Sequence, residues 1–234
     1  MKITILTLFP KVFENFLGES VIKKIITKNK IKIQTVDFRK FSKEKNHKVD
    51  DYQYGGGAGM VLQLQPLVDA IKKYRTKNSK VILMSPQGQT FNQEKARSLS
   101  KATDLILICG HYEGFDERIL NYVDEQISIG DYILTGGELA AMVIVDAVIR
   151  LTSDGISKES LECETFDNNL LDYPTYTKPV IYDGFEVPKV LLSGDHKKIE
   201  NYRKEQQIIK TKKLRPDLYN IYTSSITKDN GKNK

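Results

Sequence analysis

The sequence predicts an α/β protein with an open, mostly parallel sheet, followed by a small helical region near its C-terminal end. Two observations support this prediction. Short apolar segments rich in Ile, Val and Leu recur along the first 130 residues, as is typical of buried parallel strands. Segments of helical character separate them. Ligands of such sheets bind beyond the carboxyl ends of the strands, so the loops there are expected to carry function.

The predicted strands and helices alternate along the chain. The strands are expected at Lys2–Leu8, Ile31–Phe38, Lys80–Ser85, Asp104–Cys109 and Glu125–Ile129. The helices are expected at Val12–Thr27, Gln65–Tyr74, Gln93–Ser100 and Asp116–Asn121. Asn92 directly precedes the third of these helices and is expected to cap it.

The segment from Gly137 to Leu151 is the most apolar of the predicted helices. Its apolar residues cover nearly every face, which indicates burial in a core or in a subunit interface. Asp146 and Arg150 are its polar exceptions and lie four residues apart. They form a local ion pair, or Arg150 is retained in apolar surroundings in order to bind a ligand.

The chain after Arg150 changes character. Residues 152–169 are polar and predict a linker. A basic helix is expected at His196–Leu214 and a second, shorter helix at Pro216–Ser224, with Pro at its first position. The tail from Thr227 is expected to be frayed.

Composition excludes several classes of protein. With 40% hydrophobic and 28% charged residues, the chain is neither disordered nor collagen-like. The longest apolar run, near Leu139 to Val145, is far shorter than the ~18 residues of a membrane span, so no membrane partner is expected. The two cysteines, Cys109 and Cys163, form no CxxC pair, which fits a reducing cytoplasm.

Charge is unevenly distributed along the chain. Residues 1–48 hold 12 basic and 4 acidic residues, a net charge of +8, and residues 189–234 hold 12 basic and 5 acidic residues, a net charge of +7. The segment between them carries −9. Basic ends of this kind indicate either a polyanionic partner such as a nucleic acid or simply a solvated, lysine-rich surface.

Four glycine-bearing segments are candidates for ligand binding. Residues 50–60 contain four glycines in five positions, which either expose backbone N–H groups to an anion or form a flexible hairpin or lid. The segments 85–88, 110–114 and 128–138 each follow a predicted strand. Loops at three strand ends can line one pocket, where glycine permits close approach of the backbone to a ligand.

Together these segments resemble the bacterial tRNA (guanine-N1)-methyltransferases, a family of the knotted SPOUT class. The resemblance extends from Lys2 to about Leu218. It rests on five motifs in the family's order, namely Val49-Asp50-Asp51 with Tyr54-Gly55-Gly56-Gly57-Ala58-Gly59-Met60, Ser85-Pro86-Gln87-Gly88, Gly110-His111-Tyr112-Glu113-Gly114, Ile129-Gly130-Asp131-Tyr132 with Leu134-Thr135-Gly136-Gly137-Glu138-Leu139, and Val187-Pro188 with Val190-Leu191-Leu192-Ser193-Gly194.

The resemblance implies a trefoil-knotted domain that binds S-adenosylmethionine in residues 1–160, an interdomain linker in 161–176 and a helical tRNA-binding domain with a frayed tail in 177–234. The methyl acceptor would be N1 of the guanosine just 3′ of the anticodon. The resemblance places the cofactor contacts at Leu83, Met84, Ser85, Pro86, Gly110, Tyr112, Glu113, Gly114, Ile129, Gly130, Asp131, Tyr132, Ile133, Leu134, Gly136 and Gly137.

The resemblance also implies two catalytic residues. Guanine N1 is protonated at neutral pH, so a general base is needed, and the charge that develops on O6 needs a donor. By motif match these are Glu164, where the family commonly has Asp, and Arg150. Glu162 is the alternative base. Asp50, Ser193, His196 and Arg203 are expected to bind the tRNA substrate.

The remaining expectations concern assembly and metals. The family is homodimeric, which suits the apolar helix at 137–151, and tRNA would bind across both subunits. Mg²⁺ is a possible cofactor, although no residue spacing requires it. The three histidines show no paired ligand spacing, so no zinc site is predicted, and His111 is expected to pack within its loop.

Two other functions are open. A related knotted enzyme would methylate a ribose 2′-hydroxyl, for which a base at guanine N1 is not needed. A non-catalytic RNA-binding protein with a degenerate pocket would bind tRNA without regard to S-adenosylmethionine.

Overall fold

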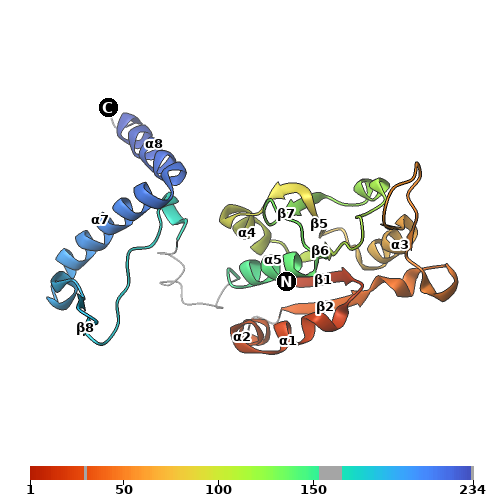
Figure 1. Ribbon diagram of the computed structural model, residues 1–234, viewed down its shortest axis with the longest axis horizontal. Helices are drawn as coiled ribbons and strands as arrows, with labels where there is room; N and C mark the ends of the chain where they lie inside the picture. The colour runs from red at the N-terminus through yellow and green to blue at the C-terminus, as the bar shows by residue number, and fades with distance from the viewer. Residues whose placement is uncertain (29–30, 153–164, 233–234) are drawn as a thin grey trace. The chain divides into compact units, whose positions relative to one another are not determined.

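The computed structural model describes residues 1–28, 31–152 and 165–232 (Figure 1). The chain divides into two compact units, Met1–Ile156 and Ser157–Lys234, and each is described by itself. Glu162, Cys163 and Glu164 lie outside the described residues.

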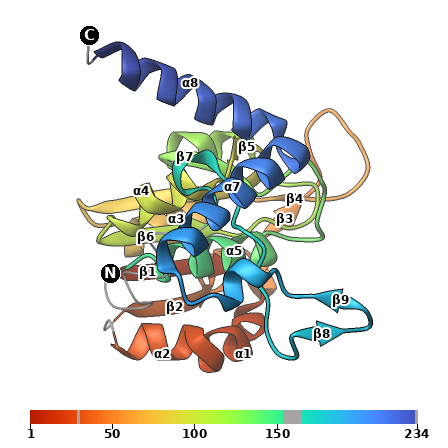
Figure 2. The ribbon, with the colours of Figure 1, turned by 90° about the vertical axis from the view of Figure 1, so that its left-hand side faces the viewer.

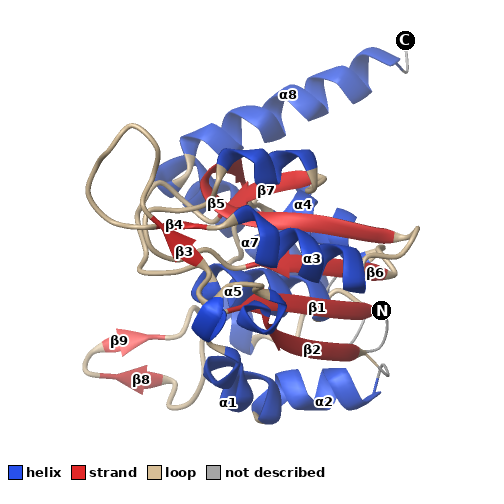
Figure 3. Ribbon diagram, turned by 90° about the vertical axis from the view of Figure 1, so that its right-hand side faces the viewer, coloured by secondary structure: helices blue, strands red, loops and turns tan. Residues whose placement is uncertain are grey.

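The first unit is built on a five-stranded parallel sheet. Its strands follow one another across the sheet in the order β2-β1-β6-β5-β7 (Figure 3). Their bounds are β1 Lys2–Thr7, β2 Lys32–Asp37, β5 Ser79–Thr90, β6 Asp104–Ile108 and β7 Glu125–Ser128. The five predicted strands are confirmed, and so is the parallel sheet.

Helices cover both faces of the sheet, because central strands such as β6 are apolar along their whole length. On one face the strands pack against α1, α2, α4 and α5, and on the other against α3. The bounds are α1 Phe13–Gly18, α2 Ser20–Lys28, α3 Leu64–Tyr74, α4 Gln93–Ser100 and α5 Glu138–Ile149. Asn92 caps α4 as predicted, since its side chain accepts from Lys95 N at 2.9 Å.

Three predicted elements differ in detail. The helix expected at Val12–Thr27 is two helices, because Gly18 ends α1 and the next residue is extended (φ −132°, ψ 171°). The helix expected at Asp116–Asn121 is a 3₁₀ segment at Glu117–Asn121, capped by Asp116. Strand β5 continues past Ser85 to Thr90 because its distal half pairs with β7 a second time.

The glycine-rich segment is a hairpin. Strands β3 Asp50–Asp51 and β4 Val61–Leu62 are antiparallel and enclose residues 52–60, the orange loop that projects beyond them in Figure 2. Two backbone bonds tie β4 to the loop after β6: Leu62 N donates to Gly114 O at 2.9 Å, and Asp116 N donates to Leu62 O at 3.0 Å. Of the two alternatives, hairpin and anion-binding loop, the backbone shows the hairpin.

The described part of the second unit, residues 165–232, combines helices and irregular segments with a small hairpin, formed by β8 Ile181–Tyr182 and β9 Phe185–Glu186 (lower right in Figure 2). The predicted helix at His196–Leu214 is confirmed as α7, whereas α8 runs from Pro216 to Lys232, past the predicted end. Leu170 is buried, and the next residue donates from its backbone N–H to Thr211 Oγ1 at 2.9 Å. The chain before the hairpin therefore packs on α7.

Candidate active site

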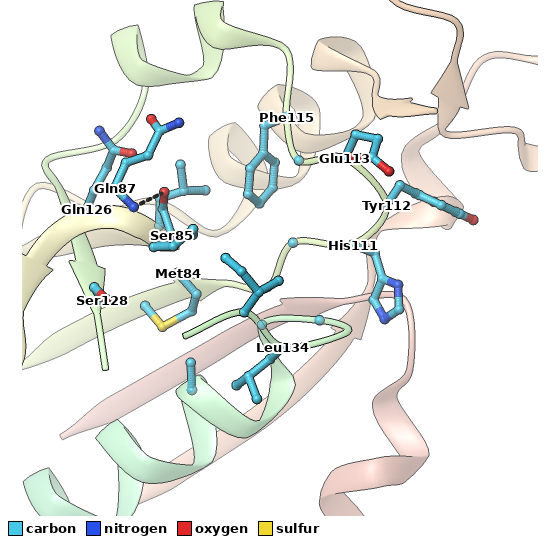
Figure 4. A pocket seen from close by; sticks show the side chains of 18 of the residues that line it. Met84, Ser85, Gln87, His111, Tyr112, Glu113, Phe115, Gln126, Ser128 and Leu134 are labelled. Carbon is cyan, nitrogen blue, oxygen red and sulfur yellow. Dashed lines mark hydrogen bonds between the residues drawn. The ribbon is translucent and has the colours of Figure 1, made fainter. Parts of the chain in front are cut away.

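A cavity of about 470 Å³ opens beyond the carboxyl ends of β6 and β7, beside the bulged middle of β5 (Figure 4). The bulged segment of β5 and the loops that follow β6 and β7 line it together, and Ala140 of α5 adds to its wall. Its volume lies in the range of ~300–1,000 Å³ that is usual for small-molecule sites. The edge of the sheet where it lies is the one at which α/β proteins bind ligands.

The cavity brings together most residues for which the sequence predicts cofactor contact. Asp131 is the exception: it is exposed and does not line the cavity. The lining contains the other fifteen, which are Leu83, Met84, Ser85, Pro86, Gly110, Tyr112, Glu113, Gly114, Ile129, Gly130, Tyr132, Ile133, Leu134, Gly136 and Gly137.

The loop after the first half of β5 is shaped by a bulge. Met84 and Gln89 both pair with Ile127 of β7, so the residues between them bend out of the sheet. Within the bend, Gln87 N donates to Ser85 Oγ at 3.2 Å (Figure 4). Gly88 lies so close to β7 that a Cβ atom would come within 2.5 Å of the Gln126 carbonyl carbon. Glycine there lets the two backbones touch.

The loops after β6 and β7 are joined at their backbones. Gly137 N donates to Gly110 O at 2.9 Å, and a Cβ on Gly137 would come within 2.8 Å of Cys109 Cα. The Gly110–Gly114 loop is also tied to the hairpin, since Glu113 N donates to Met60 O at 2.9 Å. Phe115 projects from this loop into the cavity (Figure 4). The loop after β6, the loop after β7 and the β3–β4 hairpin thus form one connected rim of the cavity.

Beneath the rim lies a buried carboxylate at the start of α5. Glu138 Oε1 accepts a hydrogen bond from Thr7 Oγ1 at 2.7 Å, and Glu138 Oε2 lies 3.8 Å from His111 Nε2. The His111 ring also packs against Phe9, which follows β1, with ring centroids 4.9 Å apart. It contacts Tyr112 of its own loop, with ring centroids 5.8 Å apart, as expected for a residue that packs within its loop. Glu138 therefore connects the end of β1 with the loop after β6.

Cys109, at the end of β6, is fully enclosed. Burial raises the pKa of its thiol well above the ordinary value, and the nearby Glu138 carboxylate raises it further. The group is therefore a neutral thiol at neutral pH, in agreement with the expectation of an inert, apolar residue.

Two of the predicted residues that would act on guanine, Arg150 and Asp50, do not line the cavity. Arg150 follows α5, and its backbone N–H donates to the Asp146 carbonyl at 3.2 Å. Asp50 pairs with Leu62 in the small β3–β4 sheet. Glu164, the predicted base, lies outside the described residues, as does its alternative Glu162.

Three predicted substrate residues belong to the second unit. Ser193 and His196 are exposed on either side of Asp195, whose carboxylate caps α7 by accepting from Lys198 N at 3.1 Å. Arg203 lies over the Tyr173 ring, with 4.7 Å between its guanidinium carbon and the ring centroid. These side chains share the surface of one helix and its N-terminal turn.

Sequence reasoning missed several residues of the cavity lining. Gln87, His111, Phe115 and Thr135 belong to the same three loops, so the continuity of each loop is the signal that could have found them. Gln126 and Ser128 come from β7 itself, on either side of the buried Ile127. Ile127 lines the cavity as well, so three consecutive residues of β7 contribute and strand alternation gives no signal that would find them.

Metal sites and membrane-spanning helices can be examined in the described part of the chain. There, no group of three or more His, Cys, Asp or Glu side chains could hold a metal ion. Residues 1–28, 31–152 and 165–232 contain no helix both long and apolar enough to cross a membrane.

Fold and cavity together define an α/β protein with a cavity of small-molecule size at the edge of its parallel sheet where ligands usually bind. Residues 1–221 match the model of the family described as tRNA (Guanine-1)-methyltransferase TrmD. The chain is 61% identical over 222 residues to the tRNA (guanine-N(1)-)-methyltransferase of Malacoplasma penetrans, covering 95% of this chain and 98% of that protein.

Two further relatives carry the same description. The protein of Ureaplasma urealyticum is 58% identical to this chain over 226 residues, and the match covers 96% of this chain and 99% of the Ureaplasma protein. That of Mycoplasmopsis pulmonis is 57% identical, covering 94% and 96%. The chain therefore belongs to the tRNA (guanine-1)-methyltransferase family and is a methyltransferase that acts on tRNA.

Proposed function

We propose that this enzyme transfers the methyl group of S-adenosylmethionine to N1 of the guanosine directly 3′ of the tRNA anticodon. The observation that carries the proposal is the convergence of the bulged segment of β5 and the loops after β6 and β7 on one cavity. The family membership supports the reaction at guanine N1 over methylation of a ribose hydroxyl, and over a protein that only binds RNA.

The cavity suits a nucleoside-like methyl donor. Apolar side chains such as Leu83, Ile127 and Leu134 line it and suit a planar base. Backbone groups of the glycine-bearing loops suit the polar edges of that base, because glycine leaves them accessible. When bound, S-adenosylmethionine supplies an electrophilic sulfonium methyl group. The lining residues named by the sequence would hold it.

The acceptor needs a base because guanine N1 carries a proton at neutral pH. We assign this role to the Glu164 carboxylate, which takes the N1 proton as the carbon–sulfur bond breaks and the N1–carbon bond forms. The Arg150 guanidinium donates to O6, where negative charge develops. Asp50 holds the guanine. Each role rests on the match to the family's motifs.

The second unit would bind tRNA. Its helix α7 carries seven Lys or Arg residues along its length, at 197, 198, 203, 204, 210, 212 and 213. Each phosphate contact by such a side chain releases counterions from the RNA, which favours binding. Ser193, His196 and Arg203 are its proposed contacts. The first unit would then be the cofactor-binding domain, joined to the second through the segment 161–176.

A homodimer is supported by an apolar surface on α5. This helix buries one face in the core, yet Leu139 and Val143, one turn apart, are 55% and 47% exposed. Phe9 and Val12 are also exposed, near the start of the first helical segment. Apolar side chains in this number are expected to be covered by a second copy of the chain.

A trefoil knot is supported by the path of the chain after β7. From that edge strand the chain returns to the end of β6, where Gly137 N meets Gly110 O, and β5 lies between the two. The bulged Ser85–Gly88 segment is the part of β5 that the returning chain must pass. A crystal structure in which the chain path passes through no loop of the same chain would contradict the knot.

No role in this mechanism is assigned to Mg²⁺. The described residues offer no group of three acidic or histidine side chains as ligands. Measuring transfer with Mg²⁺ and with a chelator decides whether the ion is required.

The test is methyl transfer to an unmodified tRNA transcript with guanosine 3′ of the anticodon. We expect 1-methylguanosine after digestion to nucleosides, and none from the same transcript with that base replaced. Arg150→Ala and Glu164→Gln should strongly reduce turnover while calorimetry shows unchanged S-adenosylmethionine binding. A 2′-O-methylated product, or equal transfer to both transcripts, would reject the proposal.

A further inference from the structure

The tip of the β3–β4 hairpin displays two aromatic side chains to solvent. Tyr54 is fully exposed and Tyr52 is 79% exposed. Aromatic rings usually bury most of their surface, because burial of a large apolar ring is favourable. Two exposed tyrosines within three residues therefore indicate a surface that a partner covers.

The backbone holds this tip at the cavity rim. The bonds Glu113 N to Met60 O and Leu62 N to Gly114 O fix the hairpin on the loop after β6. At the tip, Gly59 (φ +81°) lies so close to Glu113 that a Cβ would come within 2.7 Å of its Oε1. The position of the tip is thus set by the same loop that lines the cavity.

The residue between the two tyrosines already belongs to the cavity. Gln53 lines it, and Gly57 packs directly onto the Gln53 side chain. Tyr52 and Tyr54 are its two neighbours in sequence and do not line the cavity. The two exposed rings therefore belong to the residues on either side of a part of the cavity wall.

Two cations lie near the tyrosines, and each is paired with a carboxylate. Tyr54 lies near the Arg118 guanidinium and contributes to raising the pKa of that group, although the bond to Asp116 is the main cause. Asp116 holds Arg118 in place with bonds of 2.9 Å and 2.6 Å. Lys48 bonds Asp51 at 3.2 Å at the hairpin base. Cations beside exposed rings are typical of sites for single-stranded RNA.

We propose that Tyr54, aided by Tyr52, stacks on an unpaired nucleobase of the tRNA that flanks the target guanosine. The target base must leave its neighbours in order to enter a cavity, so the exposed face of a neighbouring base needs a new stacking partner. This inference rests on the proposed function, because it takes an anticodon loop as the substrate.

The first test compares variants at Tyr54 in steady-state methyl transfer. Tyr54→Ala should raise the KM for tRNA about 5- to 150-fold, the range expected for loss of one stacked base. Tyr54→Phe should stay within about twofold of the parent, because stacking needs the ring and not the hydroxyl group. The S-adenosylmethionine Kd should not change. Val21→Ala, which removes an exposed apolar group from α2, is the control.

A double-mutant cycle identifies the base. Transcripts with an abasic site at either nucleotide next to the target are assayed with the parent and with Tyr54→Ala. At the stacked position the abasic site and the Tyr54→Ala change should not be additive, since each removes the same contact. Additive losses at both positions, or an unchanged KM in Tyr54→Ala, would overturn the proposal.

Two outcomes separate this proposal from its alternatives. If Tyr54→Ala converts the enzyme from dimer to monomer in sedimentation, the rings belong to a subunit interface and the proposal is wrong. If the parent enzyme forms no 1-methylguanosine on the intact transcript, the proposed function fails first. If the parent methylates the transcript and Tyr54→Ala has the parent's KM for tRNA, the stacking proposal is wrong and the proposed function stands.

Discussion

At the scale of single residues, Glu138 is the buried charge that the cavity depends on. Its carboxylate receives a hydrogen bond from Thr7 Oγ1 and lies beside His111, so one side chain links the end of β1 with two loops of the rim. A buried carboxylate without such partners is costly, which makes these contacts important for stability.

Thr7→Val tests this link, because valine keeps the shape and loses the hydroxyl donor. We expect a loss of about 1–3 kcal/mol in the free energy of unfolding, measured in urea, because Glu138 is left with an unsatisfied buried oxygen. Thr27→Val is the matched control, since the Thr27 hydroxyl is exposed and bonds only the preceding turn. Its effect should stay within about 0.5 kcal/mol. Equal losses of unfolding free energy in the two variants would show that the bond from Thr7 to Glu138 does not stabilise the protein.

The same scale shows what motifs reveal and what they leave out. The sequence identified residues such as Ser85 and Tyr132 because they lie in recognisable loops, and the cavity contains them. It did not identify Glu138 as the link between loops. Its partner Thr7 is 131 residues away in the chain, and no local pattern encodes a contact of that separation.

At the scale of elements, the bulge in β5 shapes one wall of the cavity. The strand pairs with β7 on both sides of the Ser85–Gly88 bend, and Gly88 sits against the β7 backbone. Apolar residues predicted the first half of this strand, whereas Gln87, Gln89 and Thr90 in its second half gave no such signal.

Gly88→Ala should disturb the two strands together. The added methyl group meets backbone atoms of Gln126 and Ile127 at 2.5 Å, so one strand must shift. We expect a loss of about 1–3 kcal/mol in unfolding free energy, the usual cost of overpacking, and weaker S-adenosylmethionine binding by calorimetry. Gly18→Ala is the control, because no atom lies within 4 Å of its added methyl group. If the Gly88 variant binds S-adenosylmethionine as tightly as the parent, the contact between Gly88 and the β7 backbone does not shape the cofactor site.

Turn chemistry explains a second element that was missed. The β8–β9 hairpin turns at Asp183 and Gly184, which both have positive φ, at 50° and 78°. Asp-Gly between two short strand segments is a strong local signal for such a turn, so the sequence did contain it. Its strands have only two residues each, too few for alternation to predict.

At the scale of the whole molecule, the exposed apolar residues of α5 bear on whether the protein forms a dimer. Helix α5 buries most of its apolar residues and still exposes Leu139 and Val143 in a stripe. The sequence predicted an apolar helix for either a core or an interface, and the structure shows a core on one face with an apolar stripe left on the other.

Replacing both stripe residues by glutamate should produce monomers in sedimentation equilibrium, since four carboxylates would meet across a twofold interface. The control is Lys72→Glu with Lys73→Glu on α3, which changes charge on the opposite face of the sheet and should leave the dimer intact. If the parent protein is itself a monomer, or if the stripe variant remains a dimer, α5 is not the interface.

The sequence by itself determined most of the elements, the parallel sheet and the loops that line the cavity, because apolar periodicity and glycine-bearing motifs are local properties of the chain. Only the tertiary structure decided which of those loops meet, how Glu138 joins them and that the glycine-rich segment is a hairpin held at the cavity rim. These depend on contacts between residues far apart in sequence. Such contacts are fixed by the packing of the whole domain and leave no periodic signal.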